Sequence, residues 1–257
     1  MPEIITPALL LYLAVAAFGT AILHSIGGFA GALLMSIAIS PVLGIKITVP
    51  LVSVAMVVSH GMRAYVFRKT VDWPIYFLLI SVALPFILLG VYTYVSLSEA
   101  AVGLFLGTLL LITLPLRRVL KNKQIPIPRA AIGVVAVPYG FLSGASFGVG
   151  LILGPFLLGA GLTGEALVAT IAVRGFMLNL IKTIAFGISP LLGVREIAIG
   201  VGLGLCTFPG HYIGHKIVKR ATDSAHVLFI ESVMLAGALY FISRGFVTRV
   251  CYISFVT

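Results

Sequence analysis

The sequence contains few charged residues, and acidic residues are the rarest among them. Only 9% of the 257 residues are charged, and Asp and Glu together number 7. Soluble domains carry about 25% charged residues, so this composition excludes an ordinary water-soluble fold. The sequence has neither an HExxH motif nor paired carboxylates, which are typical of metal-assisted and acid–base catalysis. We therefore expect that the protein is not an enzyme.

Cysteine is equally scarce, and no nucleotide-binding loop is present. Cys206 and Cys251 provide neither a disulfide framework nor the ligand spacing of a metal site. His211 and His215 lie one helical turn apart, but a metal site needs three or four ligands. We therefore predict no metal and no cofactor. The absence of a GxxxxGK[ST] loop argues against direct use of ATP by this chain.

Hydrophobic residues, in contrast, make up 60% of the chain. The apolar runs cover 4–40, 45–66, 74–95, 99–116, 130–160, 163–187, 197–214 and 225–243. A membrane-crossing helix needs about 20 apolar residues, so we predict an all-α integral membrane protein with about eight to ten membrane segments. The net charge of +10 comes from basic residues between the runs. The positive-inside rule and anionic lipids explain this charge, so we expect contact with the lipid bilayer and none with nucleic acid.

Weak internal similarity indicates that the chain contains a repeat. An offset of 119 residues places Gly31 on Gly150, and an offset of 124 places Asp72 on Glu196 and Pro85 on Pro209. We predict a first transmembrane repeat over residues 1–122, a cytoplasmic linker over 123–129 and a second transmembrane repeat over 130–257.

The distribution of basic residues indicates that the two repeats are inverted. Residues 67–72 form a basic loop in the first half, whereas the equivalent loop at 188–196 carries one Arg and one Glu. Residues 215–220 are basic, whereas 96–98 contain no Lys or Arg. Basic loops stay in the cytoplasm, so equivalent loops face opposite sides of the membrane, as in an inverted repeat.

This topology requires the two longest apolar runs to fold back on themselves. The turns fall at 25–31 and 143–150, so each repeat contains a broken or re-entrant helix. Non-helical backbone inside a membrane is buried in protein or lines a cavity, and a helix start attracts anions. The candidate anion ligands at these turns are Ser25, Gly27, Gly28, Ser143, Ser146 and Gly148. The alternative is that Gly and Ser simply allow close helix packing.

Arg174 is the leading ligand among the charged residues. It lies near the centre of the 163–187 run, where an ionised side chain costs about 2.5–3.5 kcal/mol on insertion scales. Its guanidinium presents a rigid fork to an oxyanion, although a structural pair with a carboxylate is the alternative.

Further polar side chains on the same run match polar residues of the first half. Asn179 and Lys182 align with His60 and Arg63 at the offset of 119, and we predict all four as anion ligands. For Arg63 and Lys182, snorkelling to the lipid headgroups is the alternative.

Two further residues are candidates for coupling or for a structural pair. Glu231 lies near the middle of the 225–243 run and is either a partner for Arg174 or the carrier of a coupling proton. His24 adjoins the first turn and is a group of the kind that titrates near neutral pH. A histidine in such a turn is otherwise a satisfied hydrogen-bonding group.

The order and doubling of these motifs is similar to that of a known family. The first half contains GGFAG at 27–31, GIKITV at 44–49 and TVDW at 70–73, and the second contains SGASFGVG at 143–150 and GEALVAT at 164–170. These motifs resemble the repeat unit of the sulfite exporter TauE/SafE family of membrane permeases. The resemblance implies transport of a small anion, typically sulfite or an organosulfonate, across the bacterial cytoplasmic (inner) membrane.

We therefore predict a secondary transporter that exports a small anion by alternating access. Moving one elementary charge through 100 mV is worth about 2.3 kcal/mol, so a dianion leaves a negative interior without an obligatory coupling ion. The alternatives are an anion channel, a permease for another small carboxylate or oxyanion and, least favoured, a membrane-embedded enzyme. Proton coupling and oligomeric state are left open.

Overall fold

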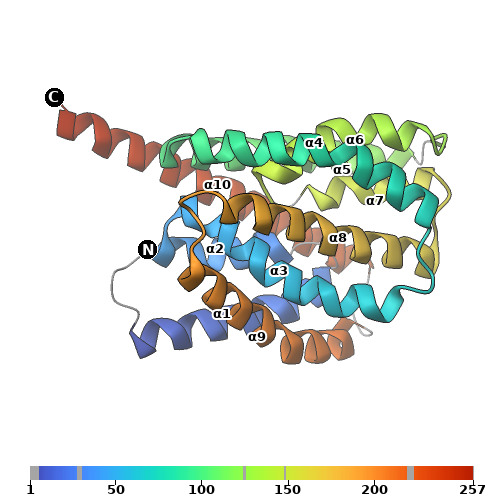
Figure 1. The fold of residues 1–257 in the computed structure, drawn as a ribbon, viewed down its shortest axis with the longest axis horizontal. Helices are drawn as coiled ribbons and strands as arrows, with labels where there is room; N and C mark the ends of the chain where they lie inside the picture. Colours follow the sequence, from blue (N-terminus) through green and yellow to red (C-terminus); the bar gives the residue numbers. More distant parts are fainter. Residues whose placement is uncertain (1–5, 28–30, 124–125, 148, 219–222, 257) are drawn as a thin grey trace.

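A computed structural model describes residues 6–27, 31–123, 126–147, 149–218 and 223–256. Over these residues the chain forms ten helices and no strands (Figure 1). The helices are α1 (Pro7–Gly27), α2 (Gly31–Leu43), α3 (Ile45–Phe67), α4 (Trp73–Ser96), α5 (Glu99–Lys123), α6 (Ala131–Ala145), α7 (Gly150–Gly159), α8 (Gly164–Gly187), α9 (Val194–Val218) and α10 (Asp223–Val256). The predicted all-α fold is confirmed.

Six of the described helices are long and apolar enough to cross a bilayer, namely α1, α3, α4, α5, α8 and α9. In contrast, α2, α6 and α7 contain 13, 15 and 10 residues. At about 1.5 Å per residue they are shorter than the hydrocarbon core of about 30 Å. Large apolar side chains such as Tyr92 and Ile188 are exposed, as expected where a protein faces lipid. The chain is an integral, multi-pass membrane protein.

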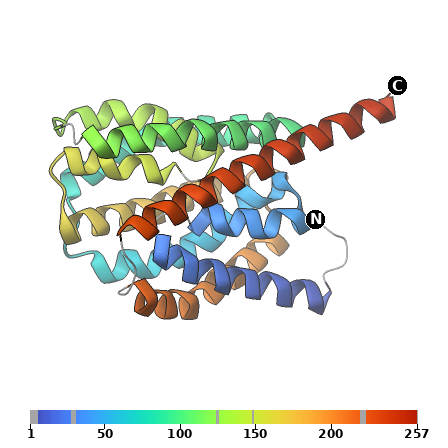
Figure 2. The same cartoon turned by 180° about the vertical axis from the view of Figure 1, so that it is seen from behind.

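Both predicted turns coincide with interruptions between helices. One interruption separates the end of α1 from the start of α2, and the other separates α6 from α7. In the second case the N–H of Ile127, just before α6, donates to the carbonyl of Gly159 at the end of α7, with N and O 2.8 Å apart. Each short helix therefore returns toward the side from which its partner came (Figure 2).

Helices of the first half pack against helices of the second half. The closest pairs are α4 with α6, α5 with α10, α1 with α9 and α3 with α8. When each helix is replaced by its equivalent in the other half (α1 by α6, α2 by α7 and so on), the α1–α9 pair becomes the α6–α4 pair. The α5–α10 and α3–α8 pairs are unchanged. Two repeats of five helices are expected to pack in this way. The proposed repeat boundaries at 122 and 130 stay predictions.

The ends of α3, α5 and α9 lie together at one end of the molecule, on the right in Figure 1 and on the left in Figure 2. Arg68, Lys69 and Lys216 belong to this end. The connections α2–α3, α4–α5 and α8–α9 lie at the opposite end. The positive-inside rule predicts that the first end faces the cytoplasm.

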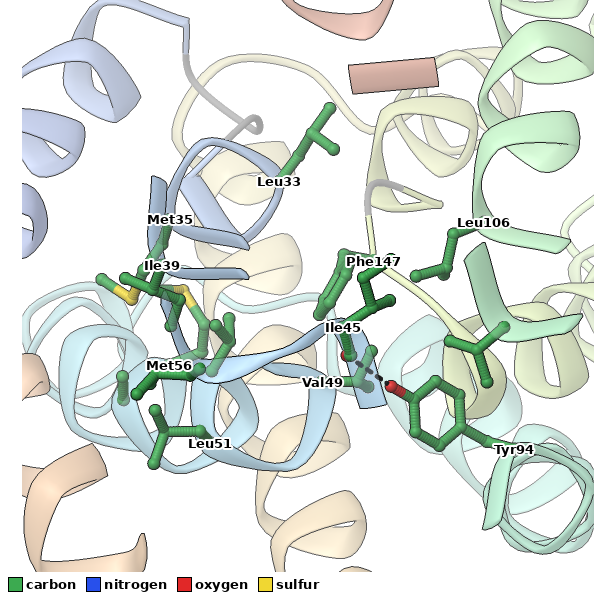
Figure 3. Close-up of a cluster of buried hydrophobic side chains, with 14 of the residues drawn as sticks. Leu33, Met35, Ile39, Ile45, Val49, Leu51, Met56, Tyr94, Leu106 and Phe147 are labelled. Atoms are coloured by element: carbon green, nitrogen blue, oxygen red, sulfur yellow. Dashed lines mark hydrogen bonds between the residues drawn. The ribbon is translucent and has the colours of Figure 1, made fainter. Parts of the chain in front are cut away.

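Hydrogen bonds from α4 and α5 hold the start of α3. Gly44 precedes α3 with φ +88°, a conformation that favours glycine. The hydroxyl of Tyr94 donates to the carbonyl of Ile45 over 3.1 Å (Figure 3). Glu99 Oε1 accepts from the N–H of Ile45 over 3.0 Å. These contacts fix the position of α3, the helix that carries His60.

Close packing of α4 against α6 depends on small residues. A Cβ at Gly144 would overlap the carbonyl oxygen of Ile87, and a Cβ at Gly90 would overlap that of Phe141. Small residues let membrane helices approach closely. This approach positions Tyr139 of α6, which is 4% exposed.

We expect Gly144→Ala to destabilise the protein by roughly 1–3 kcal/mol because the added methyl group meets main-chain atoms. The matched control is Gly133→Ala on the same helix, where the Cβ would lie 3.4 Å from the end of Leu78, an ordinary contact. Thermal unfolding of the detergent-purified variants measures both effects. Equal melting temperatures for the two variants would contradict this packing.

Cysteine labelling tests the arrangement of the basic ends. In a background with Cys206→Ser and Cys251→Ser, we expect Lys69→Cys and Lys216→Cys to react with an impermeant maleimide from the same face of a membrane vesicle. Ser98→Cys should react from the other face. All three positions are exposed in the structure. Labelling of positions 69 and 216 from opposite faces would disprove the arrangement.

Candidate functional site

A cavity of about 80 Å³ lies between α3 and α8, with further walls from α1, α2, α6 and the connection between α6 and α7. Its polar lining residues are His24, Ser53, His60, Arg63, Tyr139, Ser143, Ser146, Arg174, Asn179 and Lys182. Since about 10–15 Å³ of volume measured in this way holds one water, the cavity has room for several waters or for one small polyatomic ion.

Equivalent residues of the two halves line this cavity. The lining pairs that differ by 119 in number are His24 and Ser143, Val52 and Ile171, Ser53 and Ala172, His60 and Asn179, and Arg63 and Lys182. The first member of each pair comes from α1 or α3, and the second comes from α6 or α8. The site therefore requires both halves of the chain.

The cations of the cavity lie at successive depths. Because α3 and α8 run in opposite directions (Figure 1), equivalent positions on them lie on opposite sides of the centre. Arg63 is four residues from the end of α3, and Lys182 is five residues from the end of α8. Arg174 lies near the middle of α8. Three positive side chains thus follow one another across the interior.

No described carboxylate balances the charges of Arg174 and Lys182. Arg174 is 6% exposed and Lys182 is 2% exposed, and neither forms an ion pair with a described carboxylate. No Asp or Glu is among the lining residues. An uncompensated buried charge costs several kcal/mol, so the cavity favours an anion.

Neutral groups orient the two buried cations. Arg174 donates a hydrogen bond to the hydroxyl of Tyr139, and its guanidinium carbon lies 5.2 Å from the centre of that ring. Lys182 Nζ donates to the carbonyl of Ser146 over 3.0 Å and lies 5.9 Å from the ring centre of Phe147. The break between α6 and α7 therefore supplies a buried main-chain carbonyl to the lysine.

Three buried polar atoms of the lining have no hydrogen-bond partner among the described residues: His60 Nδ1, Ser143 Oγ and Arg174 Nε. Nearly all buried polar atoms in native proteins have a partner. The Arg174 N–H and the Ser143 hydroxyl are donors, and an oxyanion accepts from both. The arrangement is therefore suited to binding an acceptor-rich anion.

Comparison with known proteins agrees with this chemistry. The family model described as sulfite exporter TauE/SafE matches residues 12–241, which include every lining residue. The chain belongs to the TauE/SafE sulfite exporter family. No curated protein and no solved structure matches it. The resemblance inferred from the motifs is thereby confirmed, and the family is one of membrane exporters of sulfite and related anions.

In this TauE/SafE protein, the structure brings together most of the predicted ligands. The lining includes His24, His60, Arg63, Ser143, Ser146, Arg174, Asn179 and Lys182. The snorkelling alternative does not describe Lys182, which is buried with its Nζ bonded inside the protein. That these residues bind the anion stays a prediction.

Ser25 and the glycines of the first turn are placed differently. The Ser25 hydroxyl donates to the carbonyl of Ala21 over 3.1 Å and contacts His211, away from the cavity wall. Gly27 ends α1. The expectation of a free N–H at the start of α2 is wrong for Gly31, whose N–H donates to His24 Nδ1 over 2.8 Å. Gly28 and Gly148 lie outside the described residues.

Glu231 does not pair with Arg174, contrary to one of the two expectations. It accepts two hydrogen bonds from Arg118, one of them over 2.7 Å from Nε. The reason is that α10 packs along α5, which carries Arg118, and not along α8. Arg118 is 60% exposed at its side chain, so this pair lies at the edge of the protein.

Sequence reasoning missed Tyr139, Ser59 and His211. Tyr139 looks like any aromatic residue of an apolar run, and no spacing signal connects it with Arg174. His211 Nε2 lies 2.8 Å from Ser59 Oγ, although 152 residues separate them in the chain. Only helix packing brings these residues together.

Because the buried charge of Lys182 has no described counterion, its removal has a predictable effect on thermal stability. We expect Lys182→Met, measured without added anion, to leave thermal stability unchanged or to raise it, because it removes a desolvated charge and only one hydrogen bond. The exposed Lys216→Met is the control for general effects of charge removal. A loss of about 3–5 kcal/mol, as when a buried pair is broken, would reveal a hidden counterion.

Proposed function

We propose that this member of the TauE/SafE family is a secondary transporter that exports a small oxyanion, sulfite or a short organosulfonate. One observation carries the proposal: Arg174 and Lys182 are buried in a shared cavity whose described lining contains no carboxylate. In a low-dielectric interior, such charges gain most from an anionic guest.

The shape and chemistry of the cavity favour this class of anion. The Arg174 guanidinium offers donors in a planar fork, and Lys182 offers a compact charge. Ser143 adds a hydroxyl without a described partner. Apolar side chains such as Val52 and Leu178 form the remaining wall, and these suit the short carbon chain of a sulfonate. The volume of about 80 Å³ favours a small solute.

The position of the cavity supports alternating access. It lies at the contact between the two halves, and in transporters built from inverted repeats one half moves against the other around a fixed site. The cations at successive depths would keep an anion in contact with positive charge as the halves move. Each net negative charge that leaves through 100 mV gains about 2.3 kcal/mol, which favours export from a negative interior.

Counterflow in proteoliposomes tests the proposal. Vesicles loaded with unlabelled sulfonate should accumulate labelled sulfonate transiently when they contain the wild-type protein. We expect Arg174→Gln to lower the anion affinity about 10-fold to 150-fold, because hydrogen bonds to charged groups contribute about 1.5–3 kcal/mol. The control is Arg244→Gln, an exposed position on α10.

Three results would contradict the proposal. Unchanged counterflow in Arg174→Gln would remove this residue from the site. Anion conductance without counterflow would identify a channel. Absence of binding by any sulfonate, sulfite or other small oxyanion would reject an anion-binding function.

A further inference from the structure

Beside the cavity, the imidazole of His211 on α9 has a serine hydroxyl at each ring nitrogen. Nδ1 lies 3.0 Å from Ser25 Oγ on α1, and Nε2 lies 2.8 Å from Ser59 Oγ on α3. A hydroxyl both donates and accepts hydrogen bonds. Both ring nitrogens of His211 therefore have a suitable partner whether the imidazole is neutral or protonated.

The neighbouring His24, in contrast, has no suitable hydrogen-bond partner for a second proton. Its Nδ1 accepts from the N–H of Gly31 over 2.8 Å, and its Nε2 lies 3.4 Å from Nη1 of Arg63. A main-chain N–H and a guanidinium only donate. Because Nδ1 accepts, Nε2 carries the proton of the neutral ring and faces the Arg63 guanidinium. A second proton, at Nδ1, would also place two donors against each other at Gly31, so His24 is held neutral.

The hydrogen bonds define how His211 would take up a proton. Ser25 donates its own proton to the carbonyl of Ala21, so its oxygen accepts from Nδ1–H of His211. The Ser59 hydroxyl then donates to the Nε2 lone pair. A proton arriving from water binds at Nε2, and the Ser59 hydroxyl rotates to donate to a main-chain carbonyl of its own helix, as helical serines commonly do. No other bond is made or broken.

His211 is close to the anion cavity without being part of its wall. The ring centre of His24, a lining residue, lies 5.2 Å from that of His211 and 6.2 Å from that of His60. With the cavity empty, the charge of Arg63 beside His24 opposes a further positive charge on His211. An oxyanion bound at Arg63 cancels that opposition. Anion and proton therefore favour each other's binding, and this coupling is reciprocal.

The described groups around His211 contribute no negative charge of their own. The titratable or charged side chains on the cavity side of His211 are His24 from α1, His60 and Arg63 from α3, and Arg174 and Lys182 from α8. On α9 itself, Lys216 is exposed, and the side chain of His215 lies outside the described residues. The residues of α2 include no titratable side chain. On α10, which packs against α1, Glu231 is bonded to Arg118.

We propose that His211 is the proton-binding site of the transporter and that the anion crosses the membrane together with a proton on this residue. The proposal rests on the anion transport proposed above. Sulfite as a dianion with one proton still carries net negative charge, so the membrane potential favours its exit. A monoanionic sulfonate with one proton crosses as a neutral pair, and its concentration gradient alone drives its exit.

Proton uptake on anion binding tests this inference directly. Methanesulfonate, which does not titrate near neutral pH, is added to the detergent-purified protein in weakly buffered solution, and the pH change is followed with an indicator dye. Isothermal titration calorimetry measures binding in parallel. We expect wild-type protein to take up protons in proportion to the anion bound. His211→Gln, whose amide still bonds to both serines, should bind the anion and lose the proton uptake.

The control and a second measurement keep the test decisive. Tyr212→Phe, at the exposed neighbouring position, should take up protons as wild type does. If His211→Gln does not fold, the wild-type affinity decides: it should be tighter at about pH 6 than at about pH 8, the range in which histidine charge changes. Anion binding without proton uptake, a pH-independent affinity or full uptake by His211→Gln would each overturn the inference. Absence of anion binding would instead reject the proposed function.

Discussion

Buried positive charge with no carboxylate among its described neighbours is the constraint on which this structure depends. Arg174 and Lys182 lie between α3 and α8, deep in a protein whose outer surface faces lipid. Among the described residues, their hydrogen-bond partners are neutral groups: a tyrosine hydroxyl for the arginine and a main-chain carbonyl for the lysine. Such an arrangement is costly for stability alone, and it becomes favourable when an anion is present.

The broken helices make this arrangement possible. Carbonyls in the interior of a helix accept from the helix's own N–H groups, whereas the last carbonyls of a helix have no such partner. The break after α6 leaves the carbonyl of Ser146 free to accept from Lys182. In the first half, the corresponding break places His24 against the N–H of Gly31. The two breaks thus occupy equivalent places in the fold but serve different chemistry: one holds a cation, and the other fixes a neutral imidazole.

The two halves have diverged around a common framework. The four main helix pairs are preserved when the halves are exchanged, and the lining pairs keep their spacing of 119 residues. Yet Arg174 corresponds to Ala55, and the imidazoles of the first half correspond to Ser143 and Asn179. The second half therefore supplies the central charge of Arg174 and the imidazole of His211 on α9, whereas the first half supplies His24 and His60. This division fits a site in which the anion and the proton occupy adjacent places.

Much of this could be predicted from the order of residues, because membrane length, hydropathy and charge bias are local properties. They were enough to predict the all-α membrane fold and the turns near Gly31 and Gly150. The family followed from the resemblance of the motifs, and the cluster of His60, Arg63, Arg174 and Lys182 followed from their place in the apolar runs and from the alignment of the two halves. Contacts between distant helices could not be predicted in this way. Three contacts depend on how α10, α6 and α9 pack against their neighbours: the pair of Glu231 with Arg118, the hydrogen bond from Arg174 to Tyr139, and the two serine hydroxyls beside His211. No local pattern specifies which helix faces which.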